Sequence, residues 1–485
     1  MEILILVIFV VGYFGIALEH PLHVDKSAFA LLTGTLCWAV FVIGGKHDIP
    51  EHSQEEYTAI TTPAESIVGN NAEAAEMVNA LKEPTGWQDG VEYHETSFYE
   101  FRLLHHLQEI ASILFFLLGA MTIVELIDAH EGFSVITDRI KTTNTVKLLW
   151  IVGLLTFFLS AALDNLTTTI VMISLLRKLI SDKMTRWYFA GIVVIAANAG
   201  GAWSPIGDVT TTMLWIGNQL STGVIISHLF IPSLVCLIAP LLVASFMMKG
   251  NVERPRKAEG AEHYLNPTTD FERNSVFIIG ILGLLFVPVF KTVTHLPPFM
   301  GMMMSLGIIW LVTEVMHRNK NTEDKNQLSV IAVLRKIDAS SVLFFLGILL
   351  AVAALQEVGH LLVMAEWLKT TLANVFAIDL AIGVLSAIVD NVPLVAASMG
   401  MYPIIPDAMA SGAWDMNFVH DGLFWQFLAY CAGTGGSALI IGSAAGVAAM
   451  GLEKIDFIWY AKKISILALV GYFAGAAVFY VMFFL

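Results

Sequence analysis

Two long apolar stretches of this sequence, residues 148–178 and 374–402, are each interrupted near the middle by an Asp-Asn pair. The pairs are Asp164-Asn165 in "FFLSAALDNLTTTIVM" and Asp390-Asn391 in "IGVLSAIVDNVPLVAASM". An ionisable side chain at the depth of lipid hydrocarbon is costly, so each one is by default a functional-site hypothesis. Each Asp also follows a serine by four residues (Ser160 and Ser386). The recurrence predicts a duplicated site inside a membrane domain.

The bulk composition agrees with a membrane protein. Of 485 residues, 56% are hydrophobic and 14% charged, whereas a soluble domain carries about 25% charged residues. The net charge of −15 argues against a nucleic-acid partner. Three cysteines (Cys37, Cys236 and Cys431) lie in apolar runs, which predicts buried thiols and no disulfide framework.

Ten further apolar runs are long enough, or nearly so, to cross about 30 Å of hydrocarbon. They are 3–18, 27–44, 107–127, 187–219, 224–248, 273–291, 298–317, 341–363, 424–450 and 457–485. No basic region precedes the first run, so it is expected to be a first span and not a signal peptide. The runs 187–219 and 424–450 are broken by the glycine-rich stretches "NAGGAWSPIGDVTT" and "GTGGSALIIGSAAG". Irregular backbone at that depth is tolerated only inside protein or beside a cavity.

The basic residues predict which loops are cytoplasmic. Three clusters of Lys and Arg lie within 177–186, 249–257 and 318–336, and the positive-inside rule places them on the cytoplasmic side. Segment 45–103 has twelve acidic residues, and segment 402–423 has no Lys or Arg, so both are expected outside. These sides agree only if 148–178 and 374–402 enter and leave on one side. Each is therefore predicted to be a re-entrant hairpin with Asp-Asn at its tip, which leaves ten crossings.

The sequence also repeats internally. "QEIASILFFLLGA" matches "IDASSVLFFLGIL", which sets Glu109 opposite Asp338. Gly200-Gly201 falls opposite Gly435-Gly436, and Asp208 opposite Ser443. Five crossings per copy is an odd number, so the second copy is inverted. The predicted fold is an all-α polytopic membrane protein of two inverted-topology repeats, each with five spans, one re-entrant hairpin and one broken helix. Such repeats with interrupted segments point to a transport site near the midplane.

The corresponding division of the chain has five parts. We expect two scaffold spans, an acidic extracytoplasmic segment, the rest of repeat 1, a cytoplasmic linker and repeat 2. Their bounds are 1–44, 45–103, 104–249, 250–272 and 273–485, with hairpin 2 at 374–402 and its broken span at 424–450.

The chemistry at these breaks suits a small cation. No Lys or Arg occurs between Trp187 and Met248 or between Thr370 and Glu453. The site therefore offers carboxylates, amides, hydroxyls and freed carbonyls without a fixed positive charge, and hard oxygen donors suit hard cations. Mutual repulsion and burial both disfavour the charged carboxylates, so protons and metal ions would compete for them. The expected ion-binding residues are Asp164, Asn165, Thr167, Ser160, Asn198, Asp208, Ser386, Asp390, Asn391, Thr434 and Ser437, with Asp164, Asp208 and Asp390 as the charged metal ligands.

The motifs "LDNLTTT", "NAGGAWSPIGDVTT", "VDNVPLVAA" and "GTGGSALIIG" resemble those of NhaD-type sodium/proton antiporters in the ion-transporter superfamily. The resemblance covers the chain from about residue 20 onward. It implies exchange of Na+ for H+, with Li+ as an alternative ion, through elevator-like alternating access between a scaffold and a transport domain. It also implies a homodimer in a bacterial cytoplasmic membrane. No cofactor is expected beyond the transported ions.

Other interpretations remain open at this level. The Asp-Asn pairs also fit helix-breaking caps in a packed bundle, and Asp208 fits an N-cap; a cap and an ion ligand can be the same residue. Glu109 and Asp338 are candidates for a proton path, and His105, His106 and His228 for pH sensing. The same superfamily carries dicarboxylates and arsenite, and "PIGD" at 205–208 weakly resembles a motif of intramembrane aspartyl proteases. The expectation is a transporter and not an enzyme.

Overall fold

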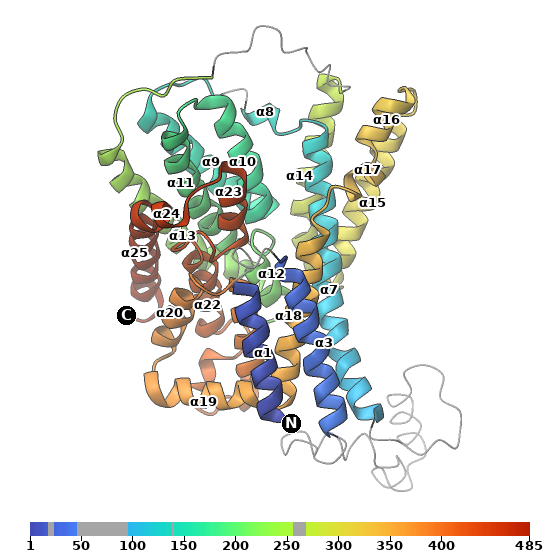
Figure 1. Ribbon diagram of the computed structural model, residues 1–485, viewed down its shortest axis with the longest axis vertical. Helices are drawn as coiled ribbons and strands as arrows, with labels where there is room; N and C mark the ends of the chain where they lie inside the picture. The colour runs from blue at the N-terminus through green and yellow to red at the C-terminus, as the bar shows by residue number, and fades with distance from the viewer. Residues whose placement is uncertain (18–23, 46–95, 138–139, 256–267) are drawn as a thin grey trace. The chain divides into compact units, whose positions relative to one another are not determined.

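The computed structural model describes residues 1–17, 24–45, 96–137, 140–255 and 268–485 (Figure 1). Regular structure in these ranges is helical, apart from one isolated antiparallel bridge between Asn144 and Asn251. Eight of the described helices are long and apolar enough to cross a membrane, or nine if one bent pair counts as a single span. Helices suit this setting because they satisfy all backbone hydrogen bonds within the segment. The chain is an all-helical, multi-pass membrane protein. Most of segment 45–103, and part of the predicted linker, lie outside the described residues.

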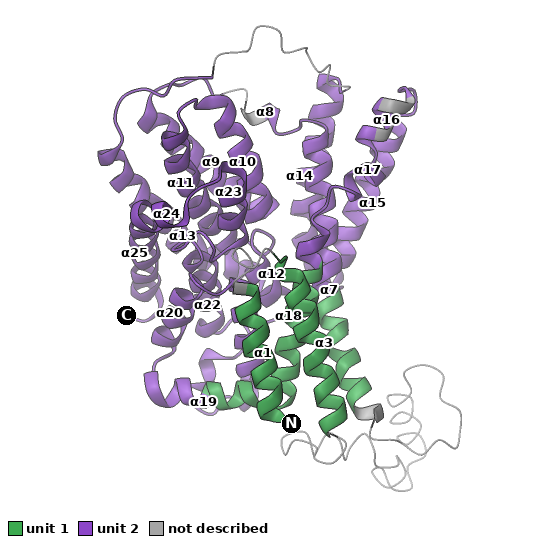
Figure 2. Cartoon of the chain, in the orientation of Figure 1, with its two compact units in different colours: residues 1–111, 343–365 green, residues 112–342, 366–485 purple. Residues whose placement is uncertain are grey.

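The chain forms two compact units, coloured separately in Figure 2. Unit 1 comprises residues 1–111 and 343–365, and unit 2 comprises residues 112–342 and 366–485. The helices that belong wholly or largely to unit 1 are α1 Glu2–Ala17, α3 Lys26–Gly45, the first half of α7 Thr96–Ala129, and α18 Ala339–Glu357.

Unit 2 holds the remaining helices, except that the first residues of α19 belong to unit 1. These are α8 Ser134–Thr137, α9 Thr145–Leu163, α10 Asn165–Leu179, α11 Lys183–Ala202, α12 Val209–Ile216, α13 Thr222–Met247, α14 Asp270–Thr294, α15 Pro298–Met316, α16 Thr322–Leu328, α17 Val330–Leu334, α19 His360–Leu372, α20 Val375–Leu385, α21 Asn391–Met401, η2 Asp407–Met409, η3 Asp415–Asn417, α22 Leu423–Gly435, α23 Ala444–Glu453, α24 Phe457–Lys463 and α25 Ser465–Phe483.

Helices α9 and α10 form a helical hairpin, here called hairpin 1. One short segment holds both of its ends: the Thr145 N–H donates to the Gly250 carbonyl (3.1 Å), and the Ser181 N–H donates to the Glu253 carbonyl (2.8 Å). Since α9 starts and α10 finishes beside residues 250–253, Asp164 lies at the far tip. The orientation of hairpin 1 in a bilayer stays a prediction.

The run predicted to form the second hairpin consists of helices α20 and α21, joined by residues 386–390, and is here called hairpin 2. Each of the two runs with a glycine-rich stretch is divided into two helices. Broken helix 1 consists of α11 and α12, and broken helix 2 consists of α22 and α23. All four assemblies belong to unit 2, so the interrupted segments that the sequence singled out share one compact body.

One predicted span differs from the structure. The run 341–363 was expected to be continuous, but α18 ends at Glu357 and α19 starts at His360. Gly359 lies between them with φ of +78°, a conformation that glycine adopts without steric cost. Helix α19 then makes an angle of 116° with α20. Hydropathy alone does not reveal such a break, because apolar residues continue through it.

Unit 1 contains a buried ion-pair cluster that the sequence analysis did not identify. Glu357, whose side chain is fully buried, accepts two hydrogen bonds from Arg102, at 2.8 Å from Nε and 2.6 Å from Nη2. His106 Nε2 lies 2.7 Å from Glu357 Oε1. The carboxylate is therefore fully partnered, and His106, a candidate pH sensor, is part of this cluster.

We predict that Glu357→Gln destabilises the protein. Removing one partner of a buried ion pair costs about 3–5 kcal/mol, because the remaining charge stays buried without compensation. A lower midpoint of thermal unfolding in detergent checks this, with Glu366→Gln, a change at an exposed carboxylate, as the matched control. Equal midpoints for the two variants would contradict it.

Candidate functional site

The tip of hairpin 1 is built around Asp164, which ends α9 and caps α10. Its Oδ1 accepts a hydrogen bond from the Thr167 N–H (2.8 Å), and its Oδ2 accepts one from Thr167 Oγ1 (2.7 Å). Its φ of 103° lies where non-glycine residues are strained. A carboxylate at a helix N-terminus is stabilised by the helix dipole. The sequence thus places a negative charge at the tip and holds it with neutral donors.

Asn165 connects this tip to broken helix 1. It is buried, and its Nδ2 donates to Asp208 Oδ2 at 2.6 Å and to Asn198 Oδ1 at 3.1 Å. Asp208 in turn caps α12, because its Oδ1 accepts hydrogen bonds from the backbone N–H and the hydroxyl of Thr210 (2.9 and 2.7 Å). Asp208 is only 1% exposed, so its carboxylate is removed from solvent in this conformation.

The network continues from broken helix 1 into broken helix 2. Asn198 Nδ2 donates to Ser437 Oγ and to Ser443 Oγ, both at 2.9 Å. Ser443 also caps α23 by accepting a hydrogen bond from the Gly446 N–H (3.2 Å). Asn198 is therefore the residue that links the two sequence repeats. Ser443 is aligned with Asp208 in the sequence repeat but is not among the predicted site residues. Both residues cap a helix, and this shared role is the sequence signal that would have identified Ser443.

The two halves of the site make the same contacts in matching positions. Ser160 Oγ donates to the Ala197 carbonyl (2.6 Å), and Ser386 Oγ donates to the Ala432 carbonyl (3.0 Å). These serines therefore tie each hairpin to its broken helix.

The glycines repeat in the same way. A Cβ atom on Gly200 would collide with the Phe157 carbonyl, and one on Gly435 with the Gly383 carbonyl. Each hairpin thus touches its broken helix backbone to backbone, a contact that only glycine allows. The opposed orientation of the two copies in a membrane stays a prediction.

The tip of hairpin 2 carries the second Asp-Asn pair. Asp390 Oδ1 accepts from the Val392 N–H at 3.4 Å, and Asn391 is buried with no partner for its Nδ2 among the described residues. The hydroxyls of Thr168, Thr169 and Thr211 are also buried without a partner there. Hairpin 2 and the threonines thus leave polar groups available beside the network.

The charges at the site are of one sign. Asp164 and Asp390 lie close enough to Asp208 to repel its carboxylate. The hydrogen bonds that Asp164 and Asp208 accept come from Thr and Asn residues and backbone amides. However, no three His, Cys, Asp or Glu side chains converge as a metal-binding group among the described residues. An ion bound here in this conformation would therefore take one or two carboxylates together with neutral oxygens.

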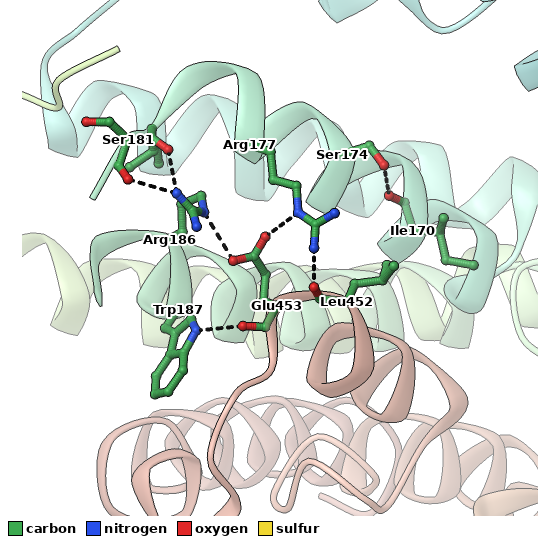
Figure 3. Close-up of polar contacts among 9 residues, drawn as sticks. Ile170, Ser174, Arg177, Ser181, Arg186, Trp187, Leu452 and Glu453 are labelled. Carbon is green, nitrogen blue, oxygen red and sulfur yellow. Dashed lines mark hydrogen bonds and ion pairs between the residues drawn. The ribbon is translucent and has the colours of Figure 1, made fainter. Parts of the chain in front are cut away.

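A second cluster joins the end of α10, the start of α11 and the end of α23 (Figure 3). The buried carboxylate of Glu453, at the end of α23, accepts hydrogen bonds from Arg177 Nε (2.7 Å) and Arg186 Nε (3.1 Å). Trp187 Nε1 donates to the Glu453 carbonyl (3.1 Å), and Arg177 also donates to the Leu452 carbonyl. Two residues of the basic cluster at 177–186 thus hold hairpin 1 and broken helix 1 to broken helix 2. Sequence reasoning used these arginines only to assign the side of the membrane.

The remaining candidates have other neighbours. Thr434 Oγ1 donates to the Tyr430 carbonyl of its own helix (2.6 Å), and His228 Nδ1 lies 2.8 Å from Gln426 Oε1. Asp338 is exposed and accepts from the N–H and hydroxyl of Ser341 at the start of α18. In unit 1, Glu109 and His105 are exposed, 3.9 Å apart. Roles in proton transfer or pH sensing for Glu109, Asp338 and the histidines stay predictions.

Comparison with known proteins identifies the family. The citrate-transporter family matches residues 5–419. Sodium/proton antiporter 1 of Arabidopsis thaliana is 43% identical over 479 residues, which cover 99% of this chain and 72% of the relative. Sodium/proton antiporter 2 of the same plant is 47% identical over 378 residues, covering 77% and 86%. The Na(+)/H(+) antiporter NhaD of Vibrio parahaemolyticus is 31% identical over 395 residues, covering 76% and 89%.

These relatives come from plants as well as bacteria, so the predicted bacterial cytoplasmic membrane stays an expectation. The family and its members are transporters, not enzymes, which excludes the protease alternative. With the motifs, the helical architecture and these similarities together, the chain belongs to the citrate-transporter family of secondary transporters, and within it to the NhaD-type sodium/proton antiporters.

Proposed function

We propose that this protein exchanges Na+ for H+ across the membrane, with the ion bound between the two hairpin tips and the two broken helices. The observation that carries the proposal is the hydrogen-bonded network from Asn165 through Asp208 and Asn198 to Ser437 and Ser443 of broken helix 2, with Asp164 next to Asn165 at the tip of hairpin 1. Its oxygens belong to carboxylates, amides and hydroxyls, which are ligands of hard cations. The names of the relatives supply the two exchanged ions, Na+ and H+.

Competition for the same carboxylates couples the two ions. When Na+ is absent, burial and mutual repulsion favour protonation of the group, and when Na+ binds, its charge replaces the protons. Exchange then follows if the sodium-loaded and proton-loaded forms move across the membrane and the empty, charged form does not. Li+ has the same hard-cation chemistry and is included in the proposal as an alternative substrate.

An elevator movement is our proposal for alternating access. It is supported by the membership of both hairpins and both broken helices in unit 2, whereas α1, α3 and most of α18 belong to unit 1. The cluster around Glu453 and the network around Asn198 tie the two repeats together. Such ties are needed if the two repeats are to move as one body. In this proposal both hairpins are re-entrant, and the protein is a homodimer, as the family resemblance implies.

The family description raises citrate as a second candidate substrate. A tricarboxylate carrier needs positive charge or helix N-termini free of acidic caps at its site. Here Asp164, Asp208 and Asp390 occupy the N-terminal ends of α10, α12 and α21, and no Lys or Arg lies in 188–247 or 371–452. Anionic substrates are therefore disfavoured. Uptake of labelled citrate and succinate by proteoliposomes should stay at the level of empty vesicles.

The first functional prediction concerns the two tips. Asp164→Asn and Asp390→Asn should each reduce sodium/proton exchange to background, since each removes a charge that would balance the ion. Asparagine caps helices as well as aspartate does, so both variants should still fold and insert. Sodium-dependent dequenching of a pH dye in everted vesicles is the measurement. Wild-type exchange by either variant would exclude a site that uses both carboxylates.

The second separates the capping role of Asp208 from its charge. Ser443 caps the equivalent helix with a hydroxyl, so Asp208→Ser should keep α12 capped while removing the charge. A unit charge about 4 Å away is worth about 4 kcal/mol near a protein surface, so apparent sodium affinity should fall at least about tenfold. Asp182→Ser, at the exposed cap of α11, is the matched control and should leave affinity unchanged. Unchanged sodium affinity in a folded Asp208→Ser variant would mean that Asp208 is only a cap.

The third concerns pH. If protons and Na+ share the carboxylates, apparent sodium affinity should rise with pH, because fewer protons compete, and level off once the group is deprotonated. The maximal rate should fall at high pH as the proton-loaded return form becomes scarce. Initial rates against Na+ concentration in proteoliposomes over a pH series give both values. An affinity independent of pH would instead favour a separate proton path, with Glu109 and Asp338 as its first candidates.

A further inference from the structure

Hairpin 2 carries a buried carboxylate that has no role in the ion site described above. Asp379 lies in the second turn of α20 and is 0% exposed. Neither of its oxygens has a hydrogen-bond partner among the described residues. At 1.5 Å per helical residue, it lies about 10 Å along α20 from Ser386, where the tip begins. It is therefore separate from Asp390.

The groups around Asp379 are neutral. It lies within electrostatic range of Tyr402, which follows α21, of Cys431 in α22 and of Tyr472 in α25. Helices α21, α22 and α25 contain no charged residue, and of the three only α21 has a carboxylate at its cap, that of Asp390. Helix α19, which precedes α20, does carry charges: Glu366 is exposed and Lys369 lies 5.5 Å from the centre of the Trp414 ring. Among the described residues, no cationic side chain contacts Asp379 and could compensate a negative charge on it.

An ionised carboxylate in such a place would be very costly. Burial of a charge without a partner or hydrogen bonds costs several kcal/mol even after relaxation, and the group takes up a proton instead. A structural role does not account for the residue, because a structural carboxylate caps a helix or forms a salt bridge, as Asp182 and Glu453 do. In the equivalent position of hairpin 1, counted from Ser160 as Asp379 is from Ser386, stands Gly153. The carboxylate is thus an addition to one repeat.

We infer that Asp379 is a second proton-binding site, carried by hairpin 2 and set apart from the Na+ ligands at the tips. The inference rests on the proposed exchange function. In the conformation seen here Asp379 holds a proton. When α20 reaches water on the other side, its O–H bond breaks and the proton passes to that water. Once the sodium-loaded body has returned, a proton from water on the first side forms the bond again before Asp379 is buried as seen here. One proton is thus moved per cycle in addition to those displaced by Na+ at the tips.

The transport test compares coupling ratios. In proteoliposomes, the reversal potential of the exchange at known Na+ and pH gradients gives the number of protons per sodium ion. Asp379→Asn, which has the shape of the neutral acid, should lower this ratio by one proton while sodium-for-sodium counterflow continues at the wild-type rate. Asp379→Glu should restore the ratio. Asp407→Asn, the same change in η2 outside the helices of hairpin 2, is the control and should leave the ratio unaltered. An unchanged ratio in Asp379→Asn overturns the inference.

A spectroscopic test does not depend on transport. Purified wild-type protein should show the infrared carbonyl band of a protonated carboxylic acid at neutral pH, which Asp379→Asn removes and Asp379→Glu shifts. If Asp379→Asn does not insert, the shift in Asp379→Glu decides alone. A band unaffected by both changes would show that Asp379 is ionised, and the inference fails. If the wild type does not exchange Na+ for H+ but the band behaves as expected, the proposed function fails while the protonated state of Asp379 stands.

Discussion

The structure depends on one unusual arrangement, in which carboxylates at helix breaks, buried at Asp208 and half-buried at Asp164, are held only by neutral groups. A buried charge normally needs an opposite charge nearby, and this protein provides that solution elsewhere, at Glu357 and at Glu453. At Asp164 and Asp208 the partners are instead amide N–H groups, hydroxyls and the Asn165 side chain. Helix N-termini contribute only partial positive charge. The site therefore carries excess negative charge, which a proton or a metal ion would neutralise.

The glycine contacts explain how the breaks are held in register. At Gly200 and Gly435 the backbone of each broken helix touches the backbone of its hairpin. The hydrogen bonds donated by Ser160 and Ser386 fix where along the helices that contact occurs. Direct backbone packing leaves little freedom for a hairpin to slide against its broken helix. The ion site can then move as one piece, because its rigidity comes from main-chain contact and not from long side chains.

The sequence was informative wherever a residue type conflicts with its surroundings. Aspartate within an apolar run is such a conflict, and so is Gly-Gly within a span, which is why the hairpin tips and the broken helices could be located before the structure was known. Contacts between distant side chains were not accessible in this way. Glu357 and Glu453 stand at the ends of apolar helices, where a carboxylate is unremarkable, and only the fold brings Arg102 or Arg177 to them. The bend after Gly359 was missed because hydropathy continues across it. Asp379 was overlooked because it lacks the Asn that marks the other two pairs.

The differences between the two repeats matter as much as their likeness. The equivalent caps of α12 and α23 are Asp208 and Ser443, and both fulfil the capping role. Capping alone therefore does not explain the carboxylate in the first repeat. A site with a fourth carboxylate at position 443 would add another negative charge within reach of the other three, and neutralising it would take one more proton or a cation of higher charge. With a hydroxyl there, one monovalent cation and few protons suffice. The asymmetry places most of the negative charge beside hairpin 1 and leaves hydroxyl and amide oxygens on the other side, a distribution that suits a monovalent hard cation better than a divalent one.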